Sequence, residues 1–283
     1  MTLQQSIVLA LQASIFMTVF DFGLQATFDD VLYVVRRPSL LVRSLVAMFV
    51  IMPVVAVTLA ETFTFLESIE IALVALSISP IPPLLPGKEK DAGGDASYGL
   101  GLMAIAAGLS IVILPLTLQL LGRYFGRSFA MSSGAIARVV LTSVILPLAA
   151  GLALRAIAPR LARRLRKPVG LVARTVLVIG VLGLLAGVLP AALALVGNGT
   201  LVALAVFAAA GLIVGHWLGG PRDDDRLVLA LSTASRHPAI ALAVASANFP
   251  DEPNLGASIV LYLLVNTLVA FPFLAWRKRR ASA

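Results

Sequence analysis

Nine apolar stretches, each long enough to cross a lipid bilayer, alternate with short polar gaps along the chain. A membrane-spanning helix needs about 20 apolar residues, because each residue rises roughly 1.5 Å along the helix axis. The nine stretches are 5–27, 39–60, 67–86, 96–121, 134–157, 168–190, 198–219, 226–249 and 255–276. Since the gaps between them are short, we expect one all-α membrane domain that covers residues 1–283.

Composition agrees with a polytopic membrane protein and excludes several other classes. Of the 283 residues, 59% are hydrophobic and 13% are charged, a balance too apolar for a water-soluble domain. The net charge of +8 would suit a nucleic-acid binder, but the basic residues lie in the gaps between apolar stretches. With no cysteine and two histidines, the chain lacks a metal-ligand cluster. We therefore expect the lipid bilayer as a partner, without nucleic acid, a bound metal or a resident cofactor.

Positive charge is concentrated in alternate gaps, as it is in the cytoplasmic loops of membrane proteins. The basic gaps follow the first, third, fifth and seventh stretches, and the C-terminal end is also basic. Near the gaps after the second and eighth stretches the charged residues are acidic, namely Glu61, Glu67, Glu70, Asp251 and Glu252, and the gap after the sixth stretch carries no charge. Arg123 and Arg127, after the fourth stretch, are the exception. The pattern predicts an integral protein of the plasma or inner membrane, with the N-terminus outside and the C-terminus in the cytoplasm.

The stretch 226–250 is long enough to span the membrane, yet polar residues and a proline occupy its middle. These residues are Ser232, Ser235, Arg236, His237 and Pro238. Pro238 is expected to break the helix, because it removes a backbone donor and blocks the preceding turn. A charged side chain near the bilayer centre costs about 2.5 to 3.5 kcal/mol, so it usually faces a bundle interior or a wet cavity. A broken, polar membrane segment of this kind is typical of a transport site. The alternative is a kinked helix whose arginine pairs with a buried carboxylate and has no further role.

The third stretch is interrupted by a run of prolines, which cannot continue a helix. The run consists of Pro80, Pro82, Pro83 and Pro86. One interpretation is a helix that ends at Ser79, followed by a cytoplasmic loop. The other is a discontinuous membrane helix. The third stretch is next to last in a group of four, and the Arg236 stretch is next to last in a group of five. Interrupted segments at matching places of two halves indicate an inverted repeat whose breaks meet at a binding site.

Several parts of the sequence resemble the bile acid:sodium symporter family. The first, at 16–53, has a Gly-Leu helix end, an acidic-to-basic link that closes on Arg-Pro, and a helix that ends near Met-Pro. The others are the third stretch, VILPLAAGLALR at 144–155, GLIVGHWLGG at 211–220 and the eighth stretch. The resemblance extends over nearly the whole chain, and its first block is the most specific. Members have ten helices, or nine when the first is missing, and this chain is similar to the nine-helix form.

The resemblance implies a transporter built from two inverted repeats, here 1–121 with four helices and 134–276 with five. It also implies a panel part and a core part, with two discontinuous helices that cross in the core. In this chain the crossing helices would be the third and eighth stretches. Alternating access would then carry an organic anion across the membrane, usually together with sodium.

The family's first sodium motif does not carry over to this chain. Its Pro-Gly-Gly-Thr-x-Ser-Asn sequence, placed without gaps from Pro80, puts the Ser-Asn pair on Leu85 and Pro86. Neither of those side chains contains an oxygen. Hard cations need about six oxygen ligands, so this half of the sodium site is missing.

The second sodium motif is replaced by cationic and donor groups. The family's Glu-x-Gly-x-Gln-Asn sequence places its glutamate on Leu231 or Ser232, and its Gln-Asn pair on Arg236 and His237. Arginine only donates hydrogen bonds, which reverses the chemistry that sodium requires. We therefore expect fixed cations to stand in for bound sodium.

Arg236 is expected to be the partner of the anion's carboxylate, because a guanidinium binds such a group with two parallel hydrogen bonds. Lys88, two residues after the lost Ser-Asn pair, is either a second fixed cation or a solvated loop residue. His237 either couples transport to protons, since imidazole changes charge at physiological pH, or is a neutral residue bonded to the backbone beside Pro238.

Hydroxyl groups and carboxylates complete the expected site. Ser232, Thr233 and Ser235 would line the cavity. Asp21, inside the first span, would be either a polar lining group or the counter-ion of Arg236. A buried charge needs a partner, so we expect a carboxylate close to the arginine. Three carboxylates are available for this role, namely Asp21, Glu89 and Asp95.

The sequence thus predicts a secondary transporter of a small organic anion that does not use the family's usual sodium sites, with sodium or a proton as the coupling ion. One alternative is ordinary sodium symport, with ligands rebuilt from backbone carbonyls near Pro238 and from Asp21. A second is a sensor or scaffold that transports nothing. A membrane-embedded enzyme is disfavoured, because the sequence has neither a metal cluster nor a convincing nucleophile and base.

Overall fold

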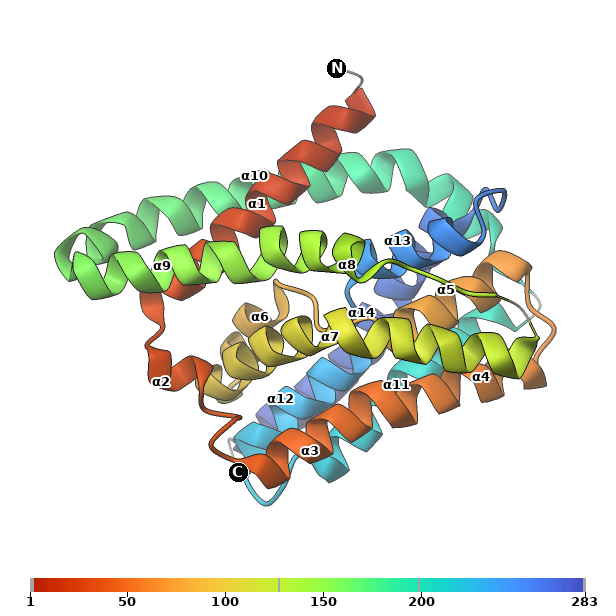
Figure 1. The fold of residues 1–283 in the computed structure, drawn as a ribbon, viewed down its shortest axis with the longest axis horizontal. Helices are drawn as coiled ribbons and strands as arrows, with labels where there is room; N and C mark the ends of the chain where they lie inside the picture. The colour runs from red at the N-terminus through yellow and green to blue at the C-terminus, as the bar shows by residue number, and fades with distance from the viewer. Residues whose placement is uncertain (1–2, 127, 198, 282–283) are drawn as a thin grey trace.

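The structure is a computed structural model that describes residues 3–126, 128–197 and 199–281, and within these ranges it is helical without a strand (Figure 1). Arg127 lies outside the described residues. The helices, with two π-helical turns η1 and η2, are α1 (Leu3–Gln25), α2 (Phe28–Val31), α3 (Pro38–Val46), η1 (Ala47–Ile51), α4 (Met52–Thr62), α5 (Glu67–Ile78), α6 (Leu85–Asp91), α7 (Ala96–Phe125), α8 (Ser133–Val140), η2 (Leu141–Ile145), α9 (Leu146–Ile157), α10 (Pro159–Ala194), α11 (Thr200–Leu218), α12 (Asp223–Ala234), α13 (Pro238–Asn248) and α14 (Leu255–Ala281).

Eight helical stretches among the described residues are long and apolar enough to cross a membrane. Each corresponds to one of the predicted stretches, so the prediction of an all-helical integral membrane protein is confirmed. The predicted stretch at 67–86 is the exception, because the structure has two short helices there, α5 and α6, instead of one long helix.

The basic gap that we expected after the fifth stretch is helical. Only Ala158 separates α9 from α10, and Pro159 starts α10, where its fixed φ suits the first turn. Residues 160–167 therefore form the first turns of α10 rather than a loop. Their arginine and lysine side chains are exposed, and such long side chains reach water while the helix backbone continues unbroken.

The helices form two groups. α1 packs against α9 and α10, and these three helices lie together on one side of the molecule (Figure 1). In the other group, α11 packs against α12 and α14, and α5 packs against α4, α13 and α14. Gly215 permits the close approach of α11 to α12, because an added Cβ would collide with the α12 backbone at Leu229 and Ala230. The two interrupted regions therefore both lie in the second group.

An ion-pair network ties the starts of α7 and α12 to the link between α2 and α3. Arg222 lies 3.2 Å from Asp95 and also pairs with Asp224. The Tyr33 hydroxyl donates a hydrogen bond of 2.9 Å to Asp95. Burial, this hydrogen bond and the nearby charge of Asp225 raise the pKa of Tyr33 above its ordinary value, so the phenol remains a donor. The network fixes where α12 begins, with acidic residues at the positive end of its dipole.

Candidate functional site

The first interrupted helix is broken by its prolines. Residues 79–84 separate α5 from α6 and are not α-helical. Pro80, Pro82 and Pro83 lie in this break, where each removes a backbone donor and its ring blocks the preceding turn. Ser79 is extended, with ψ of 150°, as the residue before a proline prefers. Because α6 packs against α7 and α12, the interpretation of a helix followed by a solvated loop is wrong.

Two residues that we expected to break helices start them instead. Pro86 lies in the first turn of α6, and Pro238 is the first residue of α13. Proline is favourable at these positions, since the first N–H groups of a helix have no intrahelical partner. Both prolines therefore lie directly after a break, in the first turn of the helix that follows it, rather than inside the break.

The second break consists of Ser235, Arg236 and His237, between α12 and α13. His237 is the N-cap of α13, and its Nδ1 accepts a hydrogen bond of 3.4 Å from the backbone N–H of Ile240. Such a cap requires an unprotonated Nδ1, so this contact belongs to a neutral imidazole. The Nε2 atom is buried and has no hydrogen-bond partner among the described residues.

The two breaks are in direct contact, and we call residues 79–84 and 235–237 the crossing. The backbone N–H of His237 donates to Pro80 O at 2.9 Å, and Arg236 Nη1 donates to Ser79 O at 3.3 Å. The prediction that the two interrupted segments meet is thus confirmed. α5 and α12 both end at the crossing, so the negative ends of two helix dipoles lie close to the arginine.

Arg236 is fully buried, and backbone carbonyls hold its guanidinium. Besides Ser79 O, it contacts Met48 O in η1, to which Nη2 donates at 3.2 Å. Its Nε has no partner, and none of the ion pairs between described residues includes it. The expectation of a carboxylate beside Arg236 is therefore wrong.

Each of the three expected carboxylates is engaged elsewhere. Asp21 on α1 accepts a hydrogen bond of 2.7 Å from a glutamine one turn later. Asp95 caps α7 and pairs with Arg222. Glu89 on α6 accepts a hydrogen bond of 2.6 Å from Ser232 Oγ. Two helix C-termini take the place of a counter-ion for the guanidinium, because each contributes roughly half a negative charge.

Some of the remaining predicted site residues lie at or next to the crossing, and others lie away from it. Ser232 and Thr233 are fully buried on α12, one turn before the break, and Ser235 lies within the break. Lys88 is exposed on α6, and Asp21 belongs to α1 in the other helix group. The structure therefore brings Ser235, Arg236 and His237 together with the proline run, but not Lys88 or Asp21.

Three residues that sequence reasoning missed complete the crossing. They are Met48, Tyr262 and Asn266. The Tyr262 hydroxyl donates to Ala234 O, which closes the C-terminal end of α12, and Asn266 Nδ2 donates to Ser235 Oγ at 3.4 Å. Both side chains come from α14. The available signal was their polarity within an otherwise apolar predicted span.

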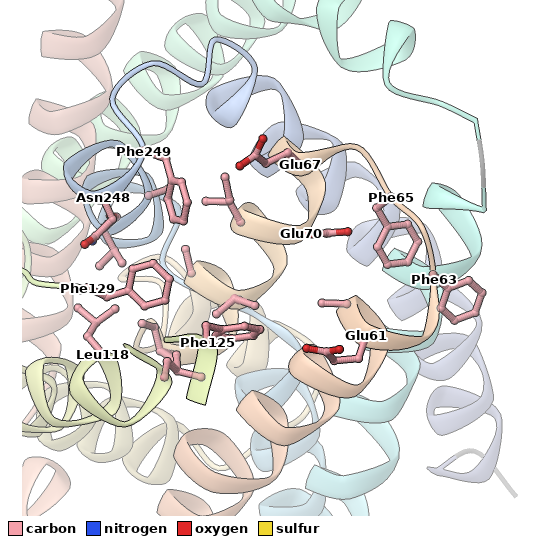
Figure 2. A pocket seen from close by; sticks show the side chains of 18 of the residues that line it. Glu61, Phe63, Phe65, Glu67, Glu70, Leu118, Phe125, Phe129, Asn248 and Phe249 are labelled. Carbon is pink, nitrogen blue, oxygen red and sulfur yellow. The ribbon is translucent and has the colours of Figure 1, made fainter. Parts of the chain in front are cut away.

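A cavity of about 720 Å³ lies near the crossing, at the ends of α4, α5, α7 and α13. Its described walls include Glu61, Glu67, Glu70 and five phenylalanines, and neither lysine nor arginine is among them (Figure 2). Ile78 and Val244 line it from the two interrupted helices. Arg236 is not a lining residue, so the expected anion-binding side chain does not face this acidic and aromatic cavity in this conformation.

Two interrupted helical segments that meet at a buried charge, with backbone carbonyls and helix ends around it, are typical of a membrane carrier. The chain belongs to the sodium bile acid symporter family, whose family model matches residues 13–203, more than half of the chain. The resemblance found in the sequence is thereby confirmed. The matched range ends before α12 and α13. Members of this family are transporters. No curated protein matches the chain.

Proposed function

We propose that this protein is a secondary transporter that moves a small organic anion across the plasma or inner membrane by alternating access. In this proposal, α5–α6 is a ninth membrane segment, and residues 1–121 and 134–276 form two inverted repeats. The N-terminus lies outside and the C-terminus in the cytoplasm. Family membership and the direct contact between the two breaks support the proposal.

One observation carries the proposed mechanism, namely a fixed cation among backbone acceptors. The Arg236 guanidinium donates to Ser79 O and Met48 O and lies where α5 and α12 end. Carriers use unwound carbonyls and half-helix C-termini of this kind to hold sodium ions. A guanidinium supplies the same positive charge without an ion from solution. We therefore propose that transport does not need sodium.

The anionic cargo is the part of the proposal that rests on the family. Arg236 is fully enclosed here, so it would contact a carboxylate only in a conformation in which the two breaks have separated. Opening would then exchange carbonyl acceptors for the oxygens of the cargo, and the buried charge would stay paired throughout the cycle.

An organic cation is the second candidate cargo, and the cavity favours it. Glu61, Glu67 and Glu70 give the cavity negative charge, and its phenylalanine rings can pack against an ammonium group (Figure 2). The same carboxylates would repel an organic anion that approaches from this side.

Ligand binding and uptake test the two candidates. Purified full-length protein is screened for thermal stabilisation by matched panels of organic anions and organic cations, because binding raises apparent stability by mass action. Uptake of a stabilising compound is then measured in proteoliposomes with either a sodium or a potassium gradient. We expect an anion as the hit and equal uptake in both gradients. A strict sodium requirement would contradict the proposed mechanism.

Two variants separate the candidate binding regions. Arg236→Ala is expected to abolish stabilisation by the anion, whereas Arg174→Ala, at an exposed arginine on α10, should leave it unchanged. Replacement of Glu61, Glu67 and Glu70 together by glutamine should have little effect on an anion hit. If it instead abolishes binding of a cation hit, the second candidate replaces the first.

A further inference from the structure

Glu89 is a buried acid of the first interrupted segment, on α6, and it is not part of the crossing. It lies on α6, is fully buried, and accepts a hydrogen bond of 2.6 Å from Ser232 Oγ on α12. Its second oxygen, Oε2, is also buried and has no hydrogen-bond partner among the described residues. None of the ion pairs between described residues includes Glu89.

The space around Oε2 depends on a glycine of α7. A Cβ at Gly99 would meet Glu89 Oε2, so a side chain at this position would require the carboxyl group to shift from its present place. Gly94, in the link between α6 and α7, also bonds its backbone N–H to Glu89 O at 2.8 Å. The backbone and the packing together therefore hold the carboxyl group at the interface between α6, α7 and α12.

The charged groups around Glu89 do not provide a cation in the buried interior. The titratable side chains at this end of α6 and of the helices around it include Lys88, Lys90 and Asp91 on α6, Tyr98 and Asp95 at α7, Asp225 on α12 and Asp21 on α1. Both lysines are exposed. The nearest arginines pair with other acids, because Arg222 pairs with Asp95 and Asp225, and Arg37 pairs with Asp225.

These surroundings favour the neutral acid. An ionised carboxylate is costly to bury unless a cation or several donors compensate it, and otherwise such a group takes up a proton instead. Among the described residues, one serine hydroxyl is the compensation for Glu89. A carboxylic acid can share a hydrogen bond with that hydroxyl in either direction, so protonation does not disrupt the contact.

We infer that Glu89 is the proton-binding group of this transporter, protonated while it packs against Ser232 and deprotonated when α6 and α12 separate. This inference rests on the proposed function and adds its coupling ion. Glu89 would take up one proton from water on one side and release it on the other, as the carboxylate re-forms. Joint movement of one proton with a monovalent anion carries no net charge.

Ser232 is a positioning residue in this scheme. In the family pattern a glutamate falls on Leu231 or Ser232, whereas here the acid comes from the opposite interrupted helix and meets the serine.

Infrared spectroscopy of the purified protein tests protonation without knowledge of the cargo. Spectra recorded between acidic and alkaline pH should contain the carbonyl stretching band of a buried protonated carboxyl group. We expect Glu89→Gln to lose this band, and Asp91→Asn, at an exposed acid of the same helix, to keep it. Ser232→Ala should shift the band, because the hydrogen bond to the acid is removed. An unchanged spectrum in Glu89→Gln would overturn the assignment.

Proteoliposomes that contain a pH-sensitive dye test coupling with the anion identified by stabilisation. The unaltered protein should acidify the interior during uptake, and Glu89→Gln should exchange labelled for unlabelled anion without proton movement. If the unaltered protein moves no anion, the proposed function fails, although the infrared result still stands on its own. If uptake occurs and Glu89→Gln still moves protons, only the inference about Glu89 fails. Sodium entry in place of protons would contradict both this inference and the proposed sodium-independent mechanism.

Discussion

The two interrupted helices meet at one place, yet they contribute opposite chemistry. The first break offers backbone acceptors, Ser79 O and Pro80 O, because its prolines have no donors. The second break offers donors, the Arg236 guanidinium and the N–H of His237. Beyond the breaks, α6 supplies an acid and α12 a hydroxyl. The two interrupted segments are thus complementary in chemistry, and each depends on a different set of residues.

The largest effect is expected when the first break is repaired. The triple change Pro80→Ala, Pro82→Ala and Pro83→Ala allows α5 to continue. The carbonyls at its end would then accept hydrogen bonds within the helix. The donors of the second break then lose their partners, at about 1 to 3 kcal/mol for each buried group left unpaired. The melting temperature and the rate of uptake should both fall sharply.

Pro115→Ala is the matched control for the proline triple. Pro115 lies inside α7, away from the crossing, and its replacement restores a helical hydrogen bond. Stability should stay the same or rise, and uptake should be retained. Normal uptake by the triple variant would show that the first break is dispensable.

Loss of the donor half is expected to have the next largest effect. Arg236→Ala leaves Ser79 O and Met48 O unpaired, again at about 1 to 3 kcal/mol for each carbonyl. Uptake should be lost. Because the variant lacks the built-in cation, sodium should raise its melting temperature, while the unaltered protein should not respond. Equal sodium responses in the two proteins would contradict the substitution of arginine for sodium.

The N-cap of α13 is expected to contribute less. His237→Ala removes the acceptor for the N–H of Ile240, and loss of a cap costs about 0.5 to 2 kcal/mol. His237→Asn keeps a side-chain acceptor and should recover most of that stability. Melting temperatures of the two variants measure the difference. Equal losses would indicate that packing of the ring, rather than the cap, is what matters.

The smallest effect is expected at Pro238. As the first residue of α13 it needs no N–H, so Pro238→Ala should change stability by at most about 1 kcal/mol, through the entropy of the unfolded chain. Uptake should continue. A large loss would mean that the second break, like the first, depends on its proline.

Much of this arrangement could be predicted from the sequence. The apolar stretches fix the membrane class, and the charges of the 226–250 stretch identify where the second helix is interrupted. The proline run could not be resolved in the same way, because prolines both end and begin helices, and Pro86 and Pro238 start helices here. The counter-ion of Arg236 was predicted wrongly, since backbone carbonyls leave no trace in a sequence pattern.

The sequence by itself determined that this is a helical membrane protein with a buried arginine between two irregular segments, because hydropathy and proline act locally along the chain. The tertiary structure alone decided what surrounds that arginine. Met48, Tyr262 and Ser79 reach the crossing from separate helices, and the pairing of Glu89 with Ser232 joins positions 143 residues apart. Contacts at such separation depend on how the helices pack, which residue order along the chain does not encode directly.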